Sequence, residues 1–415
     1  MRLTYHSITW LLFMIGLHLT HAAPVVVSGG PGNDYEGWIA RLHDTRLMVV
    51  FCRNPDWASG DLYVTFSTDG GNNWTAVQPI IVETGDQATL SYVQMPGDTI
   101  WLWYASNEDG QYGIYAAYSL DGLAWNRQGR INLGWITSTM YYDPNVILEP
   151  DSSLTMSYRG PSGAYIAHKP YNEEWDTLRT LVGTSGYRPR VMKHTNSTYL
   201  YTYHRNIGGG QYEVFVRTST DRVNWSSEIQ LTFQGNSHDP FANQMPDGAY
   251  MVYYATYQAP AYNLWRRRSY DAVNWEPQEQ LTADATNNTQ PHFFTEDNDL
   301  LLLWAHCVSY PYNHDVYFEK TPYLDITENK ENLFEKEFVL NPNPCKNCLN
   351  LQIGRTIKTD LKIVIYDITG KKLKTCCING SEDHQLSICE LAPGAYFVKI
   401  ENESKACFKK FIKVE

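Results

Sequence analysis

The sequence has few charged residues and lacks the long apolar stretches that would indicate buried helices. Charged residues make up 19% of its 415 residues, and the formal net charge at pH 7 is −12. This acidic balance argues against a nucleic-acid partner, which needs a basic face. No segment approaches the ~20 consecutive apolar residues of a transmembrane helix. Aromatic residues are abundant at 14%, and this composition favours β structure.

The first residues have the pattern of an export signal. Arg2 supplies a positive charge, Ile8–Leu19 an apolar run, and Thr20–Ala23 small residues for cleavage after Ala22 or Ala23. The run is too short to span a bilayer. We therefore expect residues 1–22 to be a signal peptide and the mature chain to be exported, with a buried core helix as the alternative.

Tryptophan recurs with a period of about 50 residues, which is typical of a propeller blade or a solenoid unit. The repeated residues are Trp74, Trp125, Trp175, Trp225 and Trp275. Four of them close a similar turn, in which an aspartate follows a serine by two positions. These aspartates are Asp69, Asp121, Asp221 and Asp271. The third repeat keeps only Asn172–Trp175, and the sixth has lost the turn.

Each repeat also contains alternating apolar and polar residues between turn residues. The second strand of each repeat is expected at Leu47–Arg53, Ile100–Ser106, Leu154–Arg159, Leu200–Arg205, Tyr250–Thr256 and Leu300–His306. A period of two favours four-stranded antiparallel sheets, and six such sheets that close radially form a propeller. The sequence therefore predicts an all-β chain: a six-bladed β-propeller over residues 24–325, followed by a small C-terminal β-sandwich.

The turns resemble the Asp-box of the sialidase superfamily, whose propellers have six blades. Only the first has the full Ser-x-Asp-x-Gly-x-x-Trp form, and the shortened ones also resemble those of other propeller glycosidases, so five-bladed hydrolases remain an alternative. The Asp of such a turn accepts hydrogen bonds from the backbone, and the Trp packs between sheets. We therefore expect a structural role for the four turn aspartates, Asp69, Asp121, Asp221 and Asp271.

The pattern changes after Asp325, where residues 326–338 are predicted as a polar linker. Beyond it, Asn341–Pro344, Ile365–Lys371 and Leu391–Lys399 resemble the type IX secretion sorting domain of Bacteroidetes. We expect residues 339–415 to be this β-sandwich, with an ordinary carbohydrate-binding sandwich as the alternative. The resemblance implies handling by the type IX machinery, removal of the domain, and a secreted or cell-surface location.

Cysteine is unevenly distributed. Cys52 and Cys307 lie in the repeats, and six more follow: Cys345, Cys348, Cys376, Cys377, Cys389 and Cys407. In an exported protein disulfides are the commoner use of cysteine. We expect a Cys52–Cys307 disulfide and up to three in the C-terminal part, where the spacing of Cys345 and Cys348 leaves zinc as an alternative.

Chain direction locates the functional face of the propeller. The Asp-containing turns join third and fourth strands, so the start of each first strand lies on the opposite face, which holds the substrate in sialidase-like folds. The residues at these starts are Glu36, Thr89, Asp143, Arg188, Asp239 and Gln290. The residues two positions later are Trp38, Ser91, Asn145, Arg190, Phe241 and His292.

Carboxylates and arginines alternate on this face. A carboxylate pair is the usual equipment for glycoside cleavage, and clustered guanidinium groups bind acidic ligands. The catalytic candidates are Glu36, Asp56, Asp143 and Asp239. The substrate-binding candidates are Arg53, Arg159, Arg188, Arg190, Arg205, His238, His292, His306 and Trp38. Alternatively, the Asp residues satisfy backbone amides in turns, the arginines form ion pairs at the rim, and the histidines serve only packing.

The segment Glu36–Arg41 replaces the Arg-Ile-Pro that sialidases have in the first blade. Tyr142 and Tyr187 are candidates for the sialidase nucleophile by position only. We expect a secreted glycoside hydrolase acting on an acidic or complex glycan, in which Asp143 and Asp239 divide the acid and base roles. We also expect a monomer with no metal and no cofactor. The alternatives are a non-catalytic glycan-binding adhesin, a surface scaffold and a polysaccharide lyase.

Overall fold

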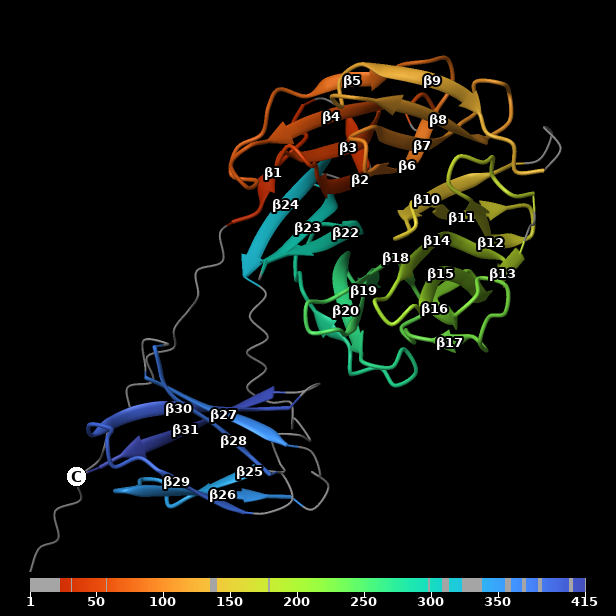
Figure 1. Cartoon of the computed structure of the whole chain (residues 1–415). Coiled ribbons are helices and arrows are strands. Elements are labelled where there is room, and N and C mark those ends of the chain that lie inside the picture. Colours follow the sequence, from red (N-terminus) through yellow and green to blue (C-terminus); the bar gives the residue numbers. More distant parts are fainter. Residues whose placement is uncertain are drawn as a thin grey trace, which may run out of the picture. The chain divides into compact units, whose positions relative to one another are not determined.

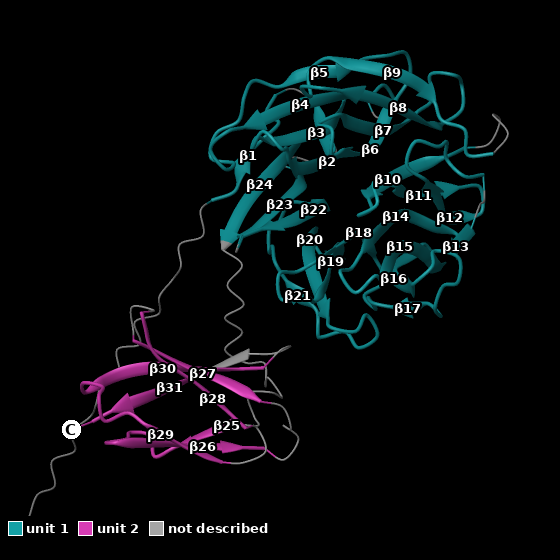
Figure 2. Ribbon diagram, viewed as in Figure 1, with its two compact units in different colours: residues 1–324 teal, residues 325–415 magenta. Residues whose placement is uncertain are grey.

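The chain forms two compact units, residues 1–324 and 325–415 (Figure 2). The computed structural model describes residues 23–30, 32–56, 58–134, 140–177, 180–297, 299–307, 313–322, 338–354, 360–367, 371–379, 383–402 and 406–414. The predicted signal peptide and residues 326–337 of the predicted linker lie outside them. In the described part of the chain every regular element is a strand, and no helix suited to crossing a membrane is found.

The described residues of the first unit form six four-stranded antiparallel sheets, arranged as the blades of a propeller (Figure 1). Blade 1 contains β2 (Asn33–Arg41), β3 (Leu47–Asn54), β4 (Asp61–Ser67) and β5 (Gln78–Ile81). Blade 2 contains β6 (Gln87–Gln94), β7 (Ile100–Ser106), β8 (Gly113–Ser119) and β9 (Trp125–Arg130). Blade 3 contains β10 (Tyr142–Leu148), β11 (Leu154–Gly160), β12 (Gly163–Lys169) and β13 (Thr180–Thr184).

The other three blades have the same antiparallel order. Blade 4 contains β14 (Gly186–Lys193), β15 (Tyr199–Gly208), β16 (Gln211–Ser219) and β17 (Ile229–Gln230). Blade 5 contains β18 (Ser237–Gln244), β19 (Tyr250–Gln258), β20 (Ala261–Ser269) and β21 (Glu279–Gln280). Blade 6 contains β22 (Asn288–Glu296), β23 (Asp299–Cys307), β24 (His314–Pro322) and β1 (Val25–Val26). The six-bladed all-β fold predicted from the repeats is confirmed.

Blade 6 draws its fourth strand from the other end of the propeller sequence. Val25 and Val26 of β1 pair antiparallel with Phe318 and Tyr317 of β24, so the first residues of the propeller close the ring (Figure 1). In this blade the chain makes no connection from third to fourth strand. The sixth repeat therefore lacks the Asp-containing turn because it has no place for one.

The four Asp-containing turns share one set of hydrogen bonds. In each, the serine hydroxyl donates to the aspartate, which accepts from the following main-chain N–H groups. Bonds from Asn73 and Asn274 lower the pKa of Asp69 and Asp271 to about 2. The indole N–H of each tryptophan donates to the carbonyl three residues before it, at 3.0–3.2 Å.

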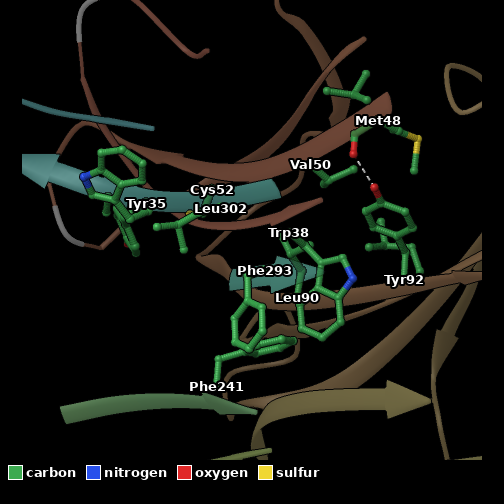
Figure 3. Close-up of a cluster of buried hydrophobic side chains, with 14 of the residues drawn as sticks. Tyr35, Trp38, Met48, Val50, Cys52, Leu90, Tyr92, Phe241, Phe293 and Leu302 are labelled. Carbon is green, nitrogen blue, oxygen red and sulfur yellow. Dashed lines mark hydrogen bonds between the residues drawn. The ribbon is translucent and has the colours of Figure 1, made fainter. Parts of the chain in front are cut away.

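Apolar side chains fill the centre of the ring and the spaces between neighbouring blades. Trp38 of β2 meets Phe241 of β18 edge to face, with ring centroids 5.6 Å apart, near the axis where first strands converge (Figure 3). Tyr92 of β6 is fully buried, and its hydroxyl donates to the main-chain oxygen of Met48 in blade 1 (Figure 3). Such bonds join adjacent sheets that share no strand pairing.

The predicted Cys52–Cys307 disulfide is wrong, because the two sulfur atoms are not bonded. Side chains alternate along a strand, so Phe51 and Cys52 of β3 point to opposite faces of blade 1. Phe51 belongs to the same apolar cluster as Leu303 of blade 6, whereas the Cys52 thiol donates to the main-chain oxygen of Gln87 in blade 2, at 3.0 Å. Cys52 therefore faces away from the blade that carries Cys307.

The second unit is a small sandwich of two sheets around one apolar core. One sheet contains β25 (Phe338–Asn341), β26 (Cys348–Ile353) and β29 (His384–Ser387). The other contains β27 (Leu361–Asp367), β28 (Lys372–Ile378), β30 (Gly394–Glu401) and β31 (Ala406–Lys413). Leu349, Leu351, Ile363 and Val398 are fully buried or nearly so between the two sheets.

The disulfides predicted for the second unit are not formed among its described cysteines. Cys345, Cys348, Cys376, Cys377 and Cys389 are free thiols. The Cys348 sulfur accepts a bond from Gln385, and the Cys389 thiol donates to the main-chain oxygen of Asn347. The side chain of Cys407 lies outside the described residues.

Candidate functional site

Each first strand of the propeller carries a β-bulge close to the axis. In blade 1 the pairing register between the first and second strands shifts between Tyr35 and Trp38. The register shifts at the corresponding place in the other five blades. One residue of each bulge has a positive φ: Glu36 (57°), Thr89 (33°), Asp143 (57°), Arg188 (49°), Asp239 (51°) and Gln290 (54°). Non-glycine residues rarely adopt this strained conformation, which is concentrated at functional sites. The six are the strand starts named from the sequence.

Hydrogen bonds link neighbouring bulges in a directional chain around the axis. The main-chain N–H of Glu36 donates to the side chain of Gln290 at 2.9 Å, and that of Thr89 donates to the Glu36 carboxylate. The N–H of Asp143 donates to the Thr89 hydroxyl at 3.2 Å, and that of Arg188 to the Asp143 carboxylate at 3.1 Å. Each of these four bulges is thus held by the side chain of the bulge before it.

The chain changes at blade 5, because an arginine side chain cannot accept a hydrogen bond. The N–H of Asp239 instead donates to Nδ1 of His204, at 3.2 Å. Burial holds the pKa of His204 well below its usual value, assisted by the charge of nearby His238. The imidazole is therefore neutral, and its Nδ1 is available as the acceptor.

Three carboxylates from different blades converge on the guanidinium of Arg188. The Glu36 carboxylate bonds Nη2, Asp143 lies 3.2 Å from Nη1, and Asp239 lies 3.6 Å from Nε. Arg188 and Asp239 keep 20% and 18% of their side-chain surface exposed, against 5% for Glu36 and 3% for Asp143. Arg188 and Asp239 are thus the members of the cluster that a ligand can reach most readily.

Burial and charge act in opposite directions on this cluster. Burial raises the pKa of Glu36 and outweighs the opposing effect of Arg188. Burial lowers the pKa of Arg188, but Glu36, Asp143 and Asp239 more than reverse this and hold it well above its usual value. Burial also lowers the pKa of the adjacent Arg190.

A cavity of about 30 Å³ lies against the cluster, lined by Glu36, Trp38, Arg188, Arg190, Asp239 and His292 among others. The His292 ring lies 4.2 Å from Trp38 and 4.2 Å from Phe241, and 6% of the residue is exposed. Neither of its ring nitrogens has a hydrogen-bond partner among the described residues. A buried polar group without a partner is costly, so its presence beside a cavity points to a ligand.

The arginines at the ends of the second strands are engaged away from the central cluster, two of them within their own blade and Arg159 by the next blade. Arg53 forms an ion pair with the buried Asp34 at 2.7 Å, and Arg205 forms one with Glu228 at 2.7 Å. Arg159 lies over the ring of Tyr187, 4.0 Å from its centroid. The structure therefore does not bring Arg53, Arg159 or Arg205 to the central cluster.

The other predicted site residues lie further from the axis. Asp56 is fully exposed in the β3–β4 loop, where it accepts bonds from Ala58 and Ser59. His306 lies 2.8 Å from the Asn288 amide oxygen and contacts the Tyr317 ring.

Several aromatic residues at blades 4 and 5 surround one another on the same face. His238 lies 2.6 Å from the Asn236 amide oxygen and contacts His204 and Tyr212. Tyr187 stacks on His204, with ring centroids 5.8 Å apart.

Sequence reasoning overlooked His204, which lies one position before the strand-end residue Arg205. The sequence signal that could have identified His204 is its place in blade 4, whose bulge residue is an arginine. Because Arg188 cannot accept a hydrogen bond, the main-chain N–H of Asp239 needs another acceptor. Tyr142, named by position alone, is partly buried, and burial raises its pKa with a further contribution from Glu36. Among the described residues no group of His, Cys, Asp or Glu is arranged to hold a metal ion.

Residues 339–414 match the family model of the secretion system C-terminal sorting domain. The resemblance stated from the motifs is thereby confirmed for the second unit. This domain indicates export by type IX secretion, to the cell surface or the exterior. No match was found among curated proteins.

Solved structures similar to the chain share its fold at low sequence identity. A protein of unknown function from Dyadobacter fermentans has a TM-score of 0.59 and 14% identity, over 72% of this chain and 99% of that one. The α-L-arabinanase of Penicillium chrysogenum, complexed with arabinobiose, has a TM-score of 0.56 and 15% identity, over 73% of this chain and 99% of that one. The Trypanosoma rangeli sialidase has a TM-score of 0.54 and 9% identity, over 93% of this chain and 87% of that one. The chain is therefore a six-bladed β-propeller of the sialidase-like fold, followed by a secretion system C-terminal sorting domain.

Proposed function

We propose that the protein is an exported glycoside hydrolase whose active site is the carboxylate cluster around Arg188. The observation that carries this proposal is the convergence of Glu36, Asp143 and Asp239 on one guanidinium at the axis. Glycoside cleavage needs two carboxyl groups at close range, one of them protonated. The similar folds of an α-L-arabinanase and a sialidase are consistent with this chemistry.

The three carboxylates differ in what their surroundings allow. Glu36 is the proposed general acid, because burial raises its pKa and favours the protonated form that gives a proton to the leaving oxygen. Asp239 is the proposed nucleophile or base, since it is more exposed and no described donor hydrogen-bonds its carboxylate. Asp143 is a positioning residue, because it is 3% exposed and holds both the main chain and the guanidinium of Arg188.

The charge of the cluster favours an uncharged sugar at the cleaved bond. Arg188 already faces three carboxylates, and the only other guanidinium at the cavity is Arg190, which donates to the main-chain oxygen of Pro189. With Glu36 protonated, the charges of Arg188 and Arg190 only balance those of Asp143 and Asp239, so the cluster keeps no net positive charge for an acidic sugar. A complex glycan with a neutral terminal sugar is the better match, and its hydroxyls would partner the ring nitrogens of His292.

A non-catalytic glycan-binding propeller is the second candidate. The observation that favours it is the small cavity of about 30 Å³, together with the bonds that already engage Glu36 and Asp143. Binding at a rigid, preformed ring of polar groups needs no free acid or base.

Incubation of the full chain with neutral, sialylated, uronate-containing and sulfated glycans tests both candidates, with products followed by mass spectrometry and binding by calorimetry. The proposal expects products from the neutral class. Turnover confined to acidic glycans would contradict the proposed substrate class. Binding without products after days of incubation would favour the second candidate.

A further inference from the structure

A second groove lies between blades 2 and 3, away from the axis. It has a volume of about 500 Å³, within the range of small-ligand sites. Its lining includes Trp101 and Trp103 of β7 and Trp175, which follows β12. It also includes Ser152 from the turn between β10 and β11, on the face opposite the bulges. Its walls share no residue with the cavity beside Arg188.

The groove lies where the third repeat has lost its Asp-containing turn. At the corresponding place between blades 1 and 2, the turn sits directly on its neighbour. A Cβ on Gly122 there would come within 2.9 Å of Met48 and of Phe66. In the third repeat Asn172 has the matching positive φ of 60°, and Tyr171 replaces the aspartate.

The wall opposite this turn is aromatic. Trp101 occupies the second position of its strand, as Met48 does in blade 1, and it is partly exposed. Its ring contacts Tyr118 and Trp103, with centroid distances of 5.3 and 6.1 Å, so neighbouring rings hold it in place. A fixed aromatic face with a wet edge is suited to the apolar C–H face of a sugar ring.

Polar groups surround this aromatic wall, and its two cations, Arg130 and Lys169, are both engaged by the protein. The Arg130 guanidinium lies over the Tyr141 ring and donates to the main-chain oxygen of Tyr112. Gln128, Asn132, Asn172 and Glu174 line the groove, and the side chains of Asn172 and Glu174 hydrogen-bond no described residue. The ammonium group of Lys169 is bound to the main-chain oxygen of Glu173. Amide and carboxylate groups beside an aromatic face provide both the hydrogen bonds and the stacking that a sugar offers.

We propose that this groove between blades 2 and 3 is a second glycan-binding site, which takes an uncharged oligosaccharide. It goes beyond the proposed function because it requires no catalysis and uses no residue of the axis. A site of this kind would hold a polysaccharide on the propeller whether or not the axis cleaves it.

Saturation-transfer NMR and calorimetry on the full chain test the proposal, with xylopentaose, cellopentaose, mannopentaose and arabinopentaose as probes. Tyr171→Ala removes an exposed ring at the groove, where 59% of the residue is accessible, so the fold should tolerate it. Tyr270→Ala is the matched control, since Tyr270 is 56% exposed at the corresponding turn of blade 5. Asp239→Asn reports on binding at the axis.

The expected result is that at least one probe binds the parent, and that Tyr171→Ala weakens this binding about fivefold, the loss of one aromatic contact. Trp101→Ala should weaken it further, while Tyr270→Ala leaves it unchanged. The proposal is overturned if no probe binds. It is also overturned if binding is lost in Asp239→Asn and unaffected by Tyr171→Ala, an outcome that would leave the proposed function intact.

Discussion

The main-chain N–H of Asp239 donates to Nδ1 of His204, at 3.2 Å. This bond replaces the link that the preceding bulge residue would otherwise supply, because Arg188 offers no acceptor. The same histidine stacks on Tyr187 and lies against His238, so one buried ring joins blades 4 and 5 beside the proposed site. An arginine at this bulge can bind three carboxylates but cannot accept the N–H of the next bulge. His204 supplies the missing acceptor.

Replacing His204 by Phe should lower the free energy of unfolding by about 1–3 kcal/mol, because the buried N–H of Asp239 then has no acceptor. Urea denaturation at pH 7.5 measures this difference. His204→Gln keeps an acceptor and should recover part of the loss. Equal stability of the Phe variant and the parent would show that the hydrogen bond from Asp239 to His204 does not stabilise the fold.

Acidification below pH 6.5 should destabilise the folded chain through its buried histidines. Burial holds the pKa values of His204 and His292 well below 6.5, whereas the unfolded residues titrate near that value. Their contribution is therefore complete above pH 6.5 and is lost as pH falls toward the folded pKa. The variant His292→Phe should show a shallower loss than the parent between pH 7.5 and 5.5. The two slopes from urea denaturation check this, and identical slopes would contradict it.

The fold was predictable because each blade repeats the same local signals. The strand at Leu47–Asn54 and the turn at Asp69 have counterparts in other repeats, so each weak signal occurs several times in the sequence. The closing strand β1 was not foreseen, because two consecutive valines carry no periodicity. Only their pairing with Phe318 and Tyr317 identifies them as the fourth strand of blade 6.

Trp225→Ala should destabilise the propeller by about 3 kcal/mol, the lower end of the range for aromatic truncation, because the residue is only partly buried. Its ring packs edge to face on Tyr201, with centroids 5.3 Å apart, and its indole N–H closes the turn at Arg222. Calorimetric melting of parent and variant measures the effect. A variant that melts within error of the parent would refute this packing role.

The positions of the candidate site residues could be predicted from the sequence, but the groups that they bind could not. Chain direction alone located the six bulge residues, because every blade begins at the axis. It could not indicate that Arg53 is paired with Asp34, since that ion pair depends on the register of β2 against β3. Nor could it separate Asp143 from Asp239, whose difference in exposure arises from how neighbouring blades pack.

Cys52 should behave as a buried thiol. In the native chain it should resist alkylation, because it is fully buried and burial raises its pKa. After denaturation without reductant it should be alkylated completely. Peptide mapping by mass spectrometry distinguishes this from a Cys52–Cys307 disulfide, which would leave Cys52 unmodified until a reductant is added.

The rate of glycan cleavage by Asp239→Asn, compared with Asp56→Asn, tests the central claim most directly. Both changes remove one carboxylate charge from the same face, but Asp56 lies in an exposed loop and Asp239 beside Arg188. With any glycan that the parent cleaves, Asp239→Asn should lower kcat by about 10²–10⁴-fold, and Asp56→Asn should leave it unchanged. Cleavage by Asp239→Asn at the parent rate would contradict an active site at the axis of the propeller.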